Sequence, residues 1–378
     1  MTSLQKIIIS NNRSDIPNNI LIERELIREK LDQIKKSSPL PLRKYIQHLY
    51  VNESSRSVNV NTALRYAREI SKYLDWCINE YLSSLLLNGT EYCDIEDIDY
   101  DYIQDYLDNL GSYSEINEHG QKVIHNKSLN TIAFKKTSIQ QFYNWMYTNE
   151  HISRNEALKL RKTAKSTAPP ILTMTDDEVK AMLELCKSGS TFIYDNEINL
   201  SSRELGYNKK NKYRDLAILS LFVYHGLRIH ELYHLNIESL DTDKDIFNIY
   251  RKRNKKAIMY FSQASKEAVQ NYIKYERNVN VKKYFDDSNP LFINYKDNER
   301  LSLRQIRRIV KKYTVKVTNN SKISPHKLRA TLATKALRTT NNIFDVQQML
   351  DHSNPVTTER YLQANEESKR EIASLINY

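Results

Sequence analysis

The stretch that decides how this chain is interpreted is HGLRIHELYHLN, residues 225–236. The apolar residues 213–224 before it predict a helix, and Gly226 is a residue at which helices commonly end. If the chain then continues as a helix at about 100° per residue, Arg228 and Glu231 lie on one face together with leucines. That face is expected to pack against the protein and to carry the arginine.

The same stretch contains HELYH, which matches the H-E-x-x-H pattern of zinc proteases. That chemistry needs His230 and His234 as ligands, Glu231 as the base, and a third ligand elsewhere. In a helix, however, the two histidines project from nearly the opposite side to Arg228 and Glu231. We therefore expect no metal here and keep a zinc hydrolase only as an alternative function.

Length and charge limit the class of protein. A chain of 378 residues is long enough for about two domains, and 40% apolar with 27% charged residues is ordinary for a globular protein. The 57 lysines and arginines outnumber the 46 acidic residues, which leaves a formal charge of +11. Such an excess favours a polyanionic partner, because neutralised phosphates release counterions. Nucleic acid is the expected partner, in preference to an anionic membrane surface.

The cysteines and the N-terminus predict a compartment. Cys77, Cys93 and Cys186 are scattered and odd in number, so they fit neither a disulfide framework nor a metal knuckle. We expect reduced thiols, two of them packed in helices, in a cytoplasmic protein. Neither a signal peptide nor an apolar run of about 18 residues is found, and no membrane association is expected. The abundance of Lys, Asn, Ile and Tyr suggests a prokaryotic or mobile-element gene.

The apolar spacing is mostly helical and predicts two lobes. Residues 1–37 are expected to form a polar leader with one charged helix, and 38–158 a helical domain. Its helices 61–78 and 128–148 each carry an apolar stripe, and 112–127 is a loop or small hairpin. Basic residues, Ser, Thr and a proline pair predict a linker over 159–170.

The second lobe is predicted over residues 171–378. Thr175, followed by acidic residues, is expected to cap its first helix. Residues 187–212 are interpreted as a polar surface insertion. Two short strands, DIFNIY and AIMYF, flank the basic turn Arg251–Lys256 and predict a β-hairpin.

Two further segments contain residues that could take part in a reaction. In SPHKLRATLAT, Ser324 is expected to cap a helix with Pro325 in its first turn, which places His326 and Arg329 three residues apart on one face. A helix N-terminus attracts an anion, and an arginine fork with an imidazole makes this a phosphate site.

The second of these segments is QQMLDHSNPVTTERYL. It predicts a helix that ends near Leu350, a turn through His352, and a new helix that carries Tyr361 one turn inside. A tyrosine close to a phosphate site is a potential nucleophile.

With these segments in this order, the chain resembles the tyrosine recombinases of the phage-integrase type. The resemblance is specific over residues 171–378 and looser over 38–158. It implies a mainly α, two-lobed fold, in which a helical SAM-like core-binding domain precedes a mostly helical catalytic domain. The latter would contain a small antiparallel sheet and end in a C-terminal exchange helix. The family's arm-binding domain is not evident in residues 1–37.

The resemblance also implies the site. The implied catalytic residues are Arg228, Lys252, His326, Arg329, His352 and Tyr361, with Glu231 in support. Two arginines would clamp the phosphate, histidines would bind it or shuttle a proton, and the lysine would protonate the leaving 5′-oxygen. The family has glycines in the hairpin turn where Arg251 and Arg253 stand here, so Lys255 and Lys256 stay open as alternatives to Lys252. The residues predicted to contact DNA are Lys135, Lys136, Arg161, Lys162, Lys165, Arg251, Arg253, Lys255 and Lys256.

The implied reaction cuts and rejoins DNA through a 3′-phosphotyrosine and needs neither ATP nor a metal, so no cofactor is expected. The implied partners are double-stranded DNA recombination sites and a homotetramer that assembles on two synapsed duplexes in the nucleoid. The C-terminal tail, with Ile372 and Leu375, would pack on its own domain or on a neighbouring subunit. A DNA-binding regulator without catalysis is the other alternative function. Supercoil relaxation or hairpin-telomere formation would use the same residues.

Overall fold

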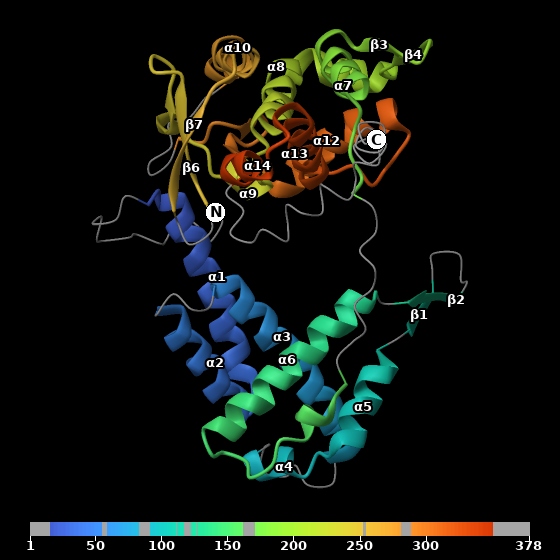
Figure 1. Cartoon of the computed structure of the whole chain (residues 1–378). Coiled ribbons are helices and arrows are strands. Elements are labelled where there is room, and N and C mark those ends of the chain that lie inside the picture. Colours follow the sequence, from blue (N-terminus) through green and yellow to red (C-terminus); the bar gives the residue numbers. More distant parts are fainter. Residues whose placement is uncertain are drawn as a thin grey trace, which may run out of the picture. The chain divides into compact units, whose positions relative to one another are not determined.

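A computed structural model of the chain describes residues 16–54, 59–82, 91–110, 112–116, 122–126, 128–161, 171–251, 255–280 and 289–350. The chain divides into two compact units (Figure 1). Unit 1 comprises Met1–Ile16 and Ile20–Thr167, and unit 2 comprises Pro17–Asn19 and Ala168–Tyr378. The domain boundaries expected from the sequence, and the roles of the domains, stay predictions.

The described residues of unit 1 are helical apart from one pair of strands. Its elements are α1 (Asn18–Ser37), α2 (Leu40–Ser54), α3 (Val60–Cys77), the π-helical turn η2 (Ile78–Leu82), α4 (Tyr92–Glu96), α5 (Tyr100–Asn109), β1 (Ser112–Ile116), β2 (Lys122–Asn126), α6 (Leu129–Thr148) and the 3-10 turn η3 (Glu156–Lys159). The sequence predicted a loop or a small hairpin over residues 112–127, and the structure shows that strands β1 and β2 pair antiparallel.

The core of unit 1 forms where the apolar stripes of α3 and α6 meet. The buried residues of these stripes include Leu64, Ala67, Ile70, Leu74, Cys77, Ile139, Phe142, Tyr143 and Met146. Helix α1 adds Ile27 and Leu31 to the same core, so the charged leader helix packs with the helices that follow it. The amphipathic spacing therefore predicted the inward faces of α3 and α6 correctly.

Unit 2 is also mostly helical and contains three small antiparallel sheets in the part that the structure describes. Its elements are α7 (Asp176–Ser188), β3 (Ser190–Ile193), β4 (Asn196–Asn199), α8 (Ser202–His225), α9 (Ile229–Tyr233), η4 (Ile237–Ser239), β5 (Leu240–Asp241), β6 (Ile246–Tyr250), β7 (Lys256–Tyr260), α10 (Gln263–Tyr272), η6 (Ile273–Arg277), α11 (Asn278–Asn280), β8 (Ile293–Asn294), β9 (Glu299–Arg300), α12 (Leu303–Thr318), α13 (Pro325–Thr340) and α14 (Ile343–Leu350). The mainly α fold with small antiparallel sheets is confirmed.

The interpretation of residues 187–212 as a polar insertion was wrong. Strands β3 and β4 pair as a hairpin, and α8 begins at Ser202 rather than near Tyr213. Ser201 and Glu204 form a capping box, in which each side chain accepts a hydrogen bond from the other residue's backbone N–H. The first half of α8 is polar, so its apolar period was too weak to reveal a helix.

The centre of unit 2 contains a buried polar network. The Asp215 carboxylate on α8 accepts hydrogen bonds from the Arg214 guanidinium at 3.0 Å and from the Tyr313 hydroxyl at 3.0 Å. The Lys312 ammonium lies 3.8 Å from it. The side chains of Arg214 and Asp215 are 3% and 0% exposed. One carboxylate therefore compensates buried positive charge at the contact between α8 and α12.

Replacing Asp215 by asparagine is expected to destabilise unit 2 by about 3–5 kcal/mol, because it leaves a buried arginine without its counter-charge. Urea unfolding, monitored by circular dichroism, measures the loss of stability. Both tryptophans, Trp76 and Trp145, lie in unit 1, so their fluorescence should report an unchanged transition there. Asp177→Asn is the matched control, because its pair with Lys180 is exposed and is expected to contribute less than about 1 kcal/mol.

Within the described residues, no helix has both the length and the apolar character needed to cross a membrane. Cys77 on α3 and Cys186 on α7 are free and buried, as the sequence predicted for two of the cysteines. Burial raises the pKa of the Cys77 thiol to about 12, so this group stays protonated at neutral pH.

Candidate active site

A tight turn at the end of α8 brings Arg228 to the site. Gly226 ends the helix with a left-handed backbone, φ +59°, which a side chain would strain. A Cβ at this position would also lie 3.1 Å from Leu332 Cδ2 and 3.4 Å from Arg329 Cγ. The chain thus passes directly against α13, and two residues later Arg228 begins the short helix α9.

Glu231 holds Arg228 in place. Its Oε2 accepts a hydrogen bond from the Arg228 backbone N–H at 2.7 Å, and its Oε1 accepts one from the Arg228 guanidinium at 2.7 Å. The Glu231 side chain is 4% exposed, whereas that of Arg228 is 41% exposed. The carboxylate is therefore an internal support, and the arginine reaches the surface from it. Arg228 precedes α9 and has an extended backbone, so its position does not follow from the expected helical geometry.

Arg329 is the buried partner of this pair. Its guanidinium donates to the backbone carbonyls of Gly226 and Leu350, and it lies 4.0 Å from Glu231 Oε2. Its side chain is 3% exposed. The guanidinium of Arg329 therefore contacts the end of α8, the end of α14 and the Glu231 carboxylate on α9. The structure brings together Arg228 and Arg329, which are about a hundred residues apart in the chain, around one carboxylate.

The start of α13 places His326 near the surface. Ser324 occupies the position before the helix and Pro325 its first turn, as expected, although the Ser324 side chain makes no capping hydrogen bond. His326 is exposed and stands one turn before the buried Arg329. Three further residues of the implied catalytic set, Lys252, His352 and Tyr361, lie outside the described residues.

The predicted hairpin is present, and its basic residues have two different environments. Strands β6 and β7 pair antiparallel from Ile246↔Tyr260 to Tyr250↔Lys256. Lys255 and Lys256 are exposed, whereas Arg251 is half-buried. Sequence reasoning grouped Arg251 with the exposed turn. The alternation of β6, which buries Phe247 and Ile249, would have predicted its inward position. Arg253 lies outside the described residues.

The other residues that were predicted to contact DNA also differ in their environments. Lys135 was expected on the outward side of α6, but it is buried and its ammonium pairs with the Glu69 carboxylate. That expectation of an outward position is corrected, because the counter-charge comes from α3, far away in sequence. Lys136 and Arg161 line a common groove beside α5, and burial lowers the pKa of Lys136. Lys162 and Lys165 lie outside the described residues.

The zinc alternative gains no support from Glu231. Both of its carboxylate oxygens are hydrogen-bonded to Arg228, so it is not placed to act as a general base. The rings of His230 and His234 have centroids 6.5 Å apart. The preceding histidine, His225, is buried against Ser265, and burial lowers its pKa to about 4.

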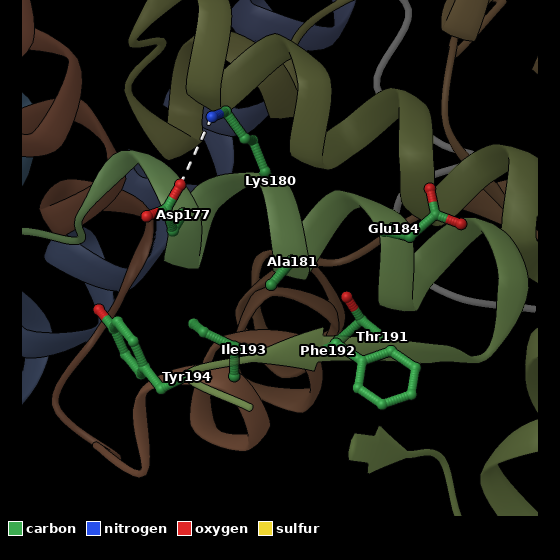
Figure 2. A pocket seen from close by; sticks show the side chains of 8 residues that line it. All are labelled: Asp177, Lys180, Ala181, Glu184, Thr191, Phe192, Ile193 and Tyr194. Atoms are coloured by element: carbon green, nitrogen blue, oxygen red, sulfur yellow. Dashed lines mark hydrogen bonds and ion pairs between the residues drawn. The ribbon is translucent and has the colours of Figure 1, made fainter. Parts of the chain in front are cut away.

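A groove lies between α7 and β3 (Figure 2). Its lining residues are Asp177, Lys180, Ala181, Glu184, Thr191, Phe192, Ile193 and Tyr194. In Figure 2 the Lys180 ammonium is paired with Asp177, at 3.4 Å. The basic residue of this lining, Lys180, is paired with Asp177. The arginine cluster around Glu231 therefore stays the candidate active site.

Comparison with known sequences identifies the family. The model of the phage integrase family matches residues 173–368, more than half of the chain. The tyrosine recombinase XerC of Thermodesulfovibrio yellowstonii is 31% identical over 242 residues, which cover 64% of this chain and 73% of the relative. The tyrosine recombinase XerS of Lactococcus lactis subsp. cremoris is 23% identical over 366 residues, 94% of this chain and all of the relative. The chain belongs to the phage integrase family of tyrosine recombinases.

Solved structures agree on the fold. The XerH site-specific recombinase in a post-cleavage complex with palindromic difH substrate aligns with a TM-score of 0.57 at 16% identity, over 97% of this chain and 90% of that one. A lambda integrase dimer bound to a core site aligns with a TM-score of 0.54 at 14% identity, over 86% and 95%. The tyrosine recombinase fold expected from the sequence is confirmed.

Proposed function

We propose that this protein is a site-specific DNA recombinase that cuts and rejoins DNA through a 3′-phosphotyrosine formed by Tyr361. The observation that carries the proposal is the pair of arginines, Arg228 and Arg329, held around Glu231. Guanidinium groups bind phosphate oxygens bidentately and stabilise the charge that develops when a phosphorus is attacked. Family membership and the recombinases named above support the same reaction.

In the proposed reaction the Tyr361 oxygen forms a bond to phosphorus while the bond to the 5′-oxygen breaks. The tyrosine proton passes to a histidine, His326 or His352, and Lys252 protonates the departing 5′-oxygen. The phosphodiester energy is kept in the phosphotyrosine. A 5′-hydroxyl of the partner duplex then attacks it, which releases the tyrosine and joins the exchanged strand. Integration, excision and resolution of a mobile element are all compatible with these steps.

The proposed partners follow from the same chemistry. The solved relatives include recombinases bound to DNA, and the excess of positive charge favours a duplex. We propose that this chain acts as a homotetramer on two recombination sites in the cytoplasm, with its C-terminal tail on a neighbouring subunit. Lys136, Arg161, Lys255 and Lys256 are proposed to contact the DNA backbone, together with Lys162, Lys165 and Arg253.

The test uses a pool of nicked duplexes with randomised sequence around the nick, because the target site is unknown. The nick lets the short cleaved strand diffuse away, so the covalent intermediate accumulates. The protein is incubated with the pool in EDTA and denatured in detergent, and protein-linked DNA is isolated and sequenced. We expect enrichment of one sequence, and after nuclease digestion a nucleotide adduct on the peptide that contains Tyr361.

The same experiment separates the alternatives. If the chain is a regulator, it enriches a sequence by native binding, yet no covalent complex forms. A zinc hydrolase would depend on metal, would lose activity in Glu231→Gln, and would leave no DNA attached to the protein. A covalent complex on a residue other than Tyr361 would overturn the proposed nucleophile.

A further inference from the structure

Arg300 on β9 contacts the backbone at the end of α9, the short helix that carries Glu231. Its Nη1 donates to the Tyr233 carbonyl at 2.7 Å and to the Leu235 carbonyl at 3.0 Å. Its Nη2 donates to the side-chain carbonyl of Asn236. Because a guanidinium is planar and its donors have fixed directions, these bonds fix both the position and the orientation of the chain where α9 ends.

Helix α9 depends on such contacts because it is short. It spans five residues, Ile229–Tyr233, and an isolated helix of this length is not stable in water. The last carbonyls of a helix have no partner within it, and an arginine can supply the missing donors. The bond from Arg300 to the Tyr233 carbonyl has this role. The position of α9, and of Glu231 on it, is therefore set by neighbouring elements.

The element that carries Arg300 is itself well anchored. Strands β8 and β9 pair at Ile293↔Arg300. Leu291, which precedes β8, is fully buried, and its N–H donates to the Leu235 carbonyl at 2.9 Å. The carbonyl of Leu291 accepts a hydrogen bond from the buried Arg277 guanidinium at 3.0 Å. Arg300 thus holds the end of α9 from a segment that is fixed in the core of unit 2.

The position of α9 determines where the Arg228 guanidinium lies. Glu231 stands two residues before Tyr233, and its carboxylate accepts a hydrogen bond from the Arg228 guanidinium at 2.7 Å. A shift of α9 would move this carboxylate and the guanidinium that it holds. Misplacing a catalytic group by about 1 Å can slow a reaction about 10²-fold. The contacts of Arg300 therefore bear on the placement of a residue that is proposed to bind the attacked phosphate.

We propose that Arg300 is a positioning residue of the phosphate site, which acts through α9 and Glu231 on the guanidinium of Arg228. The inference rests on the proposed function and adds a residue to its machinery. Affinity for DNA comes from many cations along the backbone, whereas the rate of cleavage depends on the placement of a few groups. Arg300 is therefore expected to raise the rate of cleavage more than the affinity for DNA.

The first experiment compares Arg300→Met with Arg300→Lys. Methionine keeps an unbranched side chain and removes the three hydrogen bonds, whereas lysine keeps the charge but cannot bind three acceptors in one plane. Covalent complex formation is measured in single turnover with saturating protein, on the nicked duplex selected above, at a temperature at which each variant is folded. We expect Arg300→Met to react about 30-fold slower and Arg300→Lys about tenfold slower, each with a DNA affinity within about threefold of wild type.

A double-mutant cycle distinguishes positioning from a general loss of structure. Once the guanidinium of Arg228 is absent, removing Arg300 should cost little more. We expect Arg228→Met with Arg300→Met to react within about threefold of Arg228→Met alone. In a His326→Gln background, Arg300→Met should keep the loss that it shows in the wild type. A merely structural role would lower the rate by the same factor in both backgrounds. If Arg300→Met does not fold, Arg300→Lys takes its place in the cycle.

Arg203→Met is the matched control, because Arg203 is exposed in the first turn of α8, about 33 Å along the helix from its end at His225. Its rate and affinity should equal those of wild type.

The outcomes separate this inference from the function beneath it. If the wild-type protein forms no covalent complex, the proposed function fails. If the wild type reacts and the Arg300 variants react equally fast, the inference is overturned while the function stands. Losses that multiply in the Arg228→Met background would show that Arg300 acts independently of Arg228, and this also overturns the inference.

Discussion

Tyr361→Phe is expected to abolish the covalent protein–DNA complex while DNA binding is retained. The substitution removes one hydroxyl, which is the proposed nucleophile, and phenylalanine has no atom that can replace it. A free tyrosine has a pKa of about 10, so only about one in a thousand is ionised at pH 7. The hydroxyl can therefore react only where a base takes its proton and cations neutralise the phosphate.

Three other tyrosines of unit 2 are not suited to replace Tyr361 as the nucleophile. Burial raises the pKa values of Tyr272, Tyr295 and Tyr313, and these hydroxyls are held in hydrogen bonds within the core. Tyr260 is 74% exposed and is the matched control, because Tyr260→Phe removes an accessible hydroxyl from the same unit. The measurement is the covalent band on a denaturing gel, together with native gel shifts. A covalent band of normal intensity in Tyr361→Phe would refute the assignment.

Arg329→Met is expected to slow covalent complex formation by about 10³-fold or more. Loss of one donor to a transition-state oxyanion costs about 10²–10³-fold, and Arg329 has a second role besides its proposed contact with the phosphate. Its guanidinium also joins the carbonyls of Gly226 and Leu350, which end α8 and α14. Methionine would leave both carbonyls without this donor and Glu231 with one counter-charge fewer.

The variant Arg329→Lys should recover little of this loss. An ammonium is a point charge and cannot hold two carbonyls and a phosphate in the planar geometry of a guanidinium. Arg338→Met on the same helix is the matched control, because Arg338 is exposed and its loss changes the net charge equally. Single-turnover rates and the melting of unit 2 are measured in parallel. A rate within about tenfold of wild type, in a folded Arg329→Met protein, would exclude Arg329 from the phosphate site.

Several features of the fold could be predicted from the sequence alone. Helical spacing predicted the inward faces of α3 and α6, and local capping rules predicted Thr175 and Ser324 at helix starts. The hairpin was predicted from two short strands on either side of a basic turn, and the order of the motifs indicated the family. Each of these features depends on neighbours within a few residues or on motif order, which a linear sequence contains in full.

Only the tertiary structure decided which charged residues are buried and which partners they have. The sequence predicted that Arg329 binds a phosphate and that Lys135 contacts DNA. In the structure, Arg329 is held by Gly226, Leu350 and Glu231, and Lys135 pairs with Glu69. Arg251 likewise turned inward, where its guanidinium contacts the Met259 sulfur. The physical reason is the same in each case. The environment of a long charged side chain is set by elements that are distant in sequence, and no local pattern specifies which of them will fold against it.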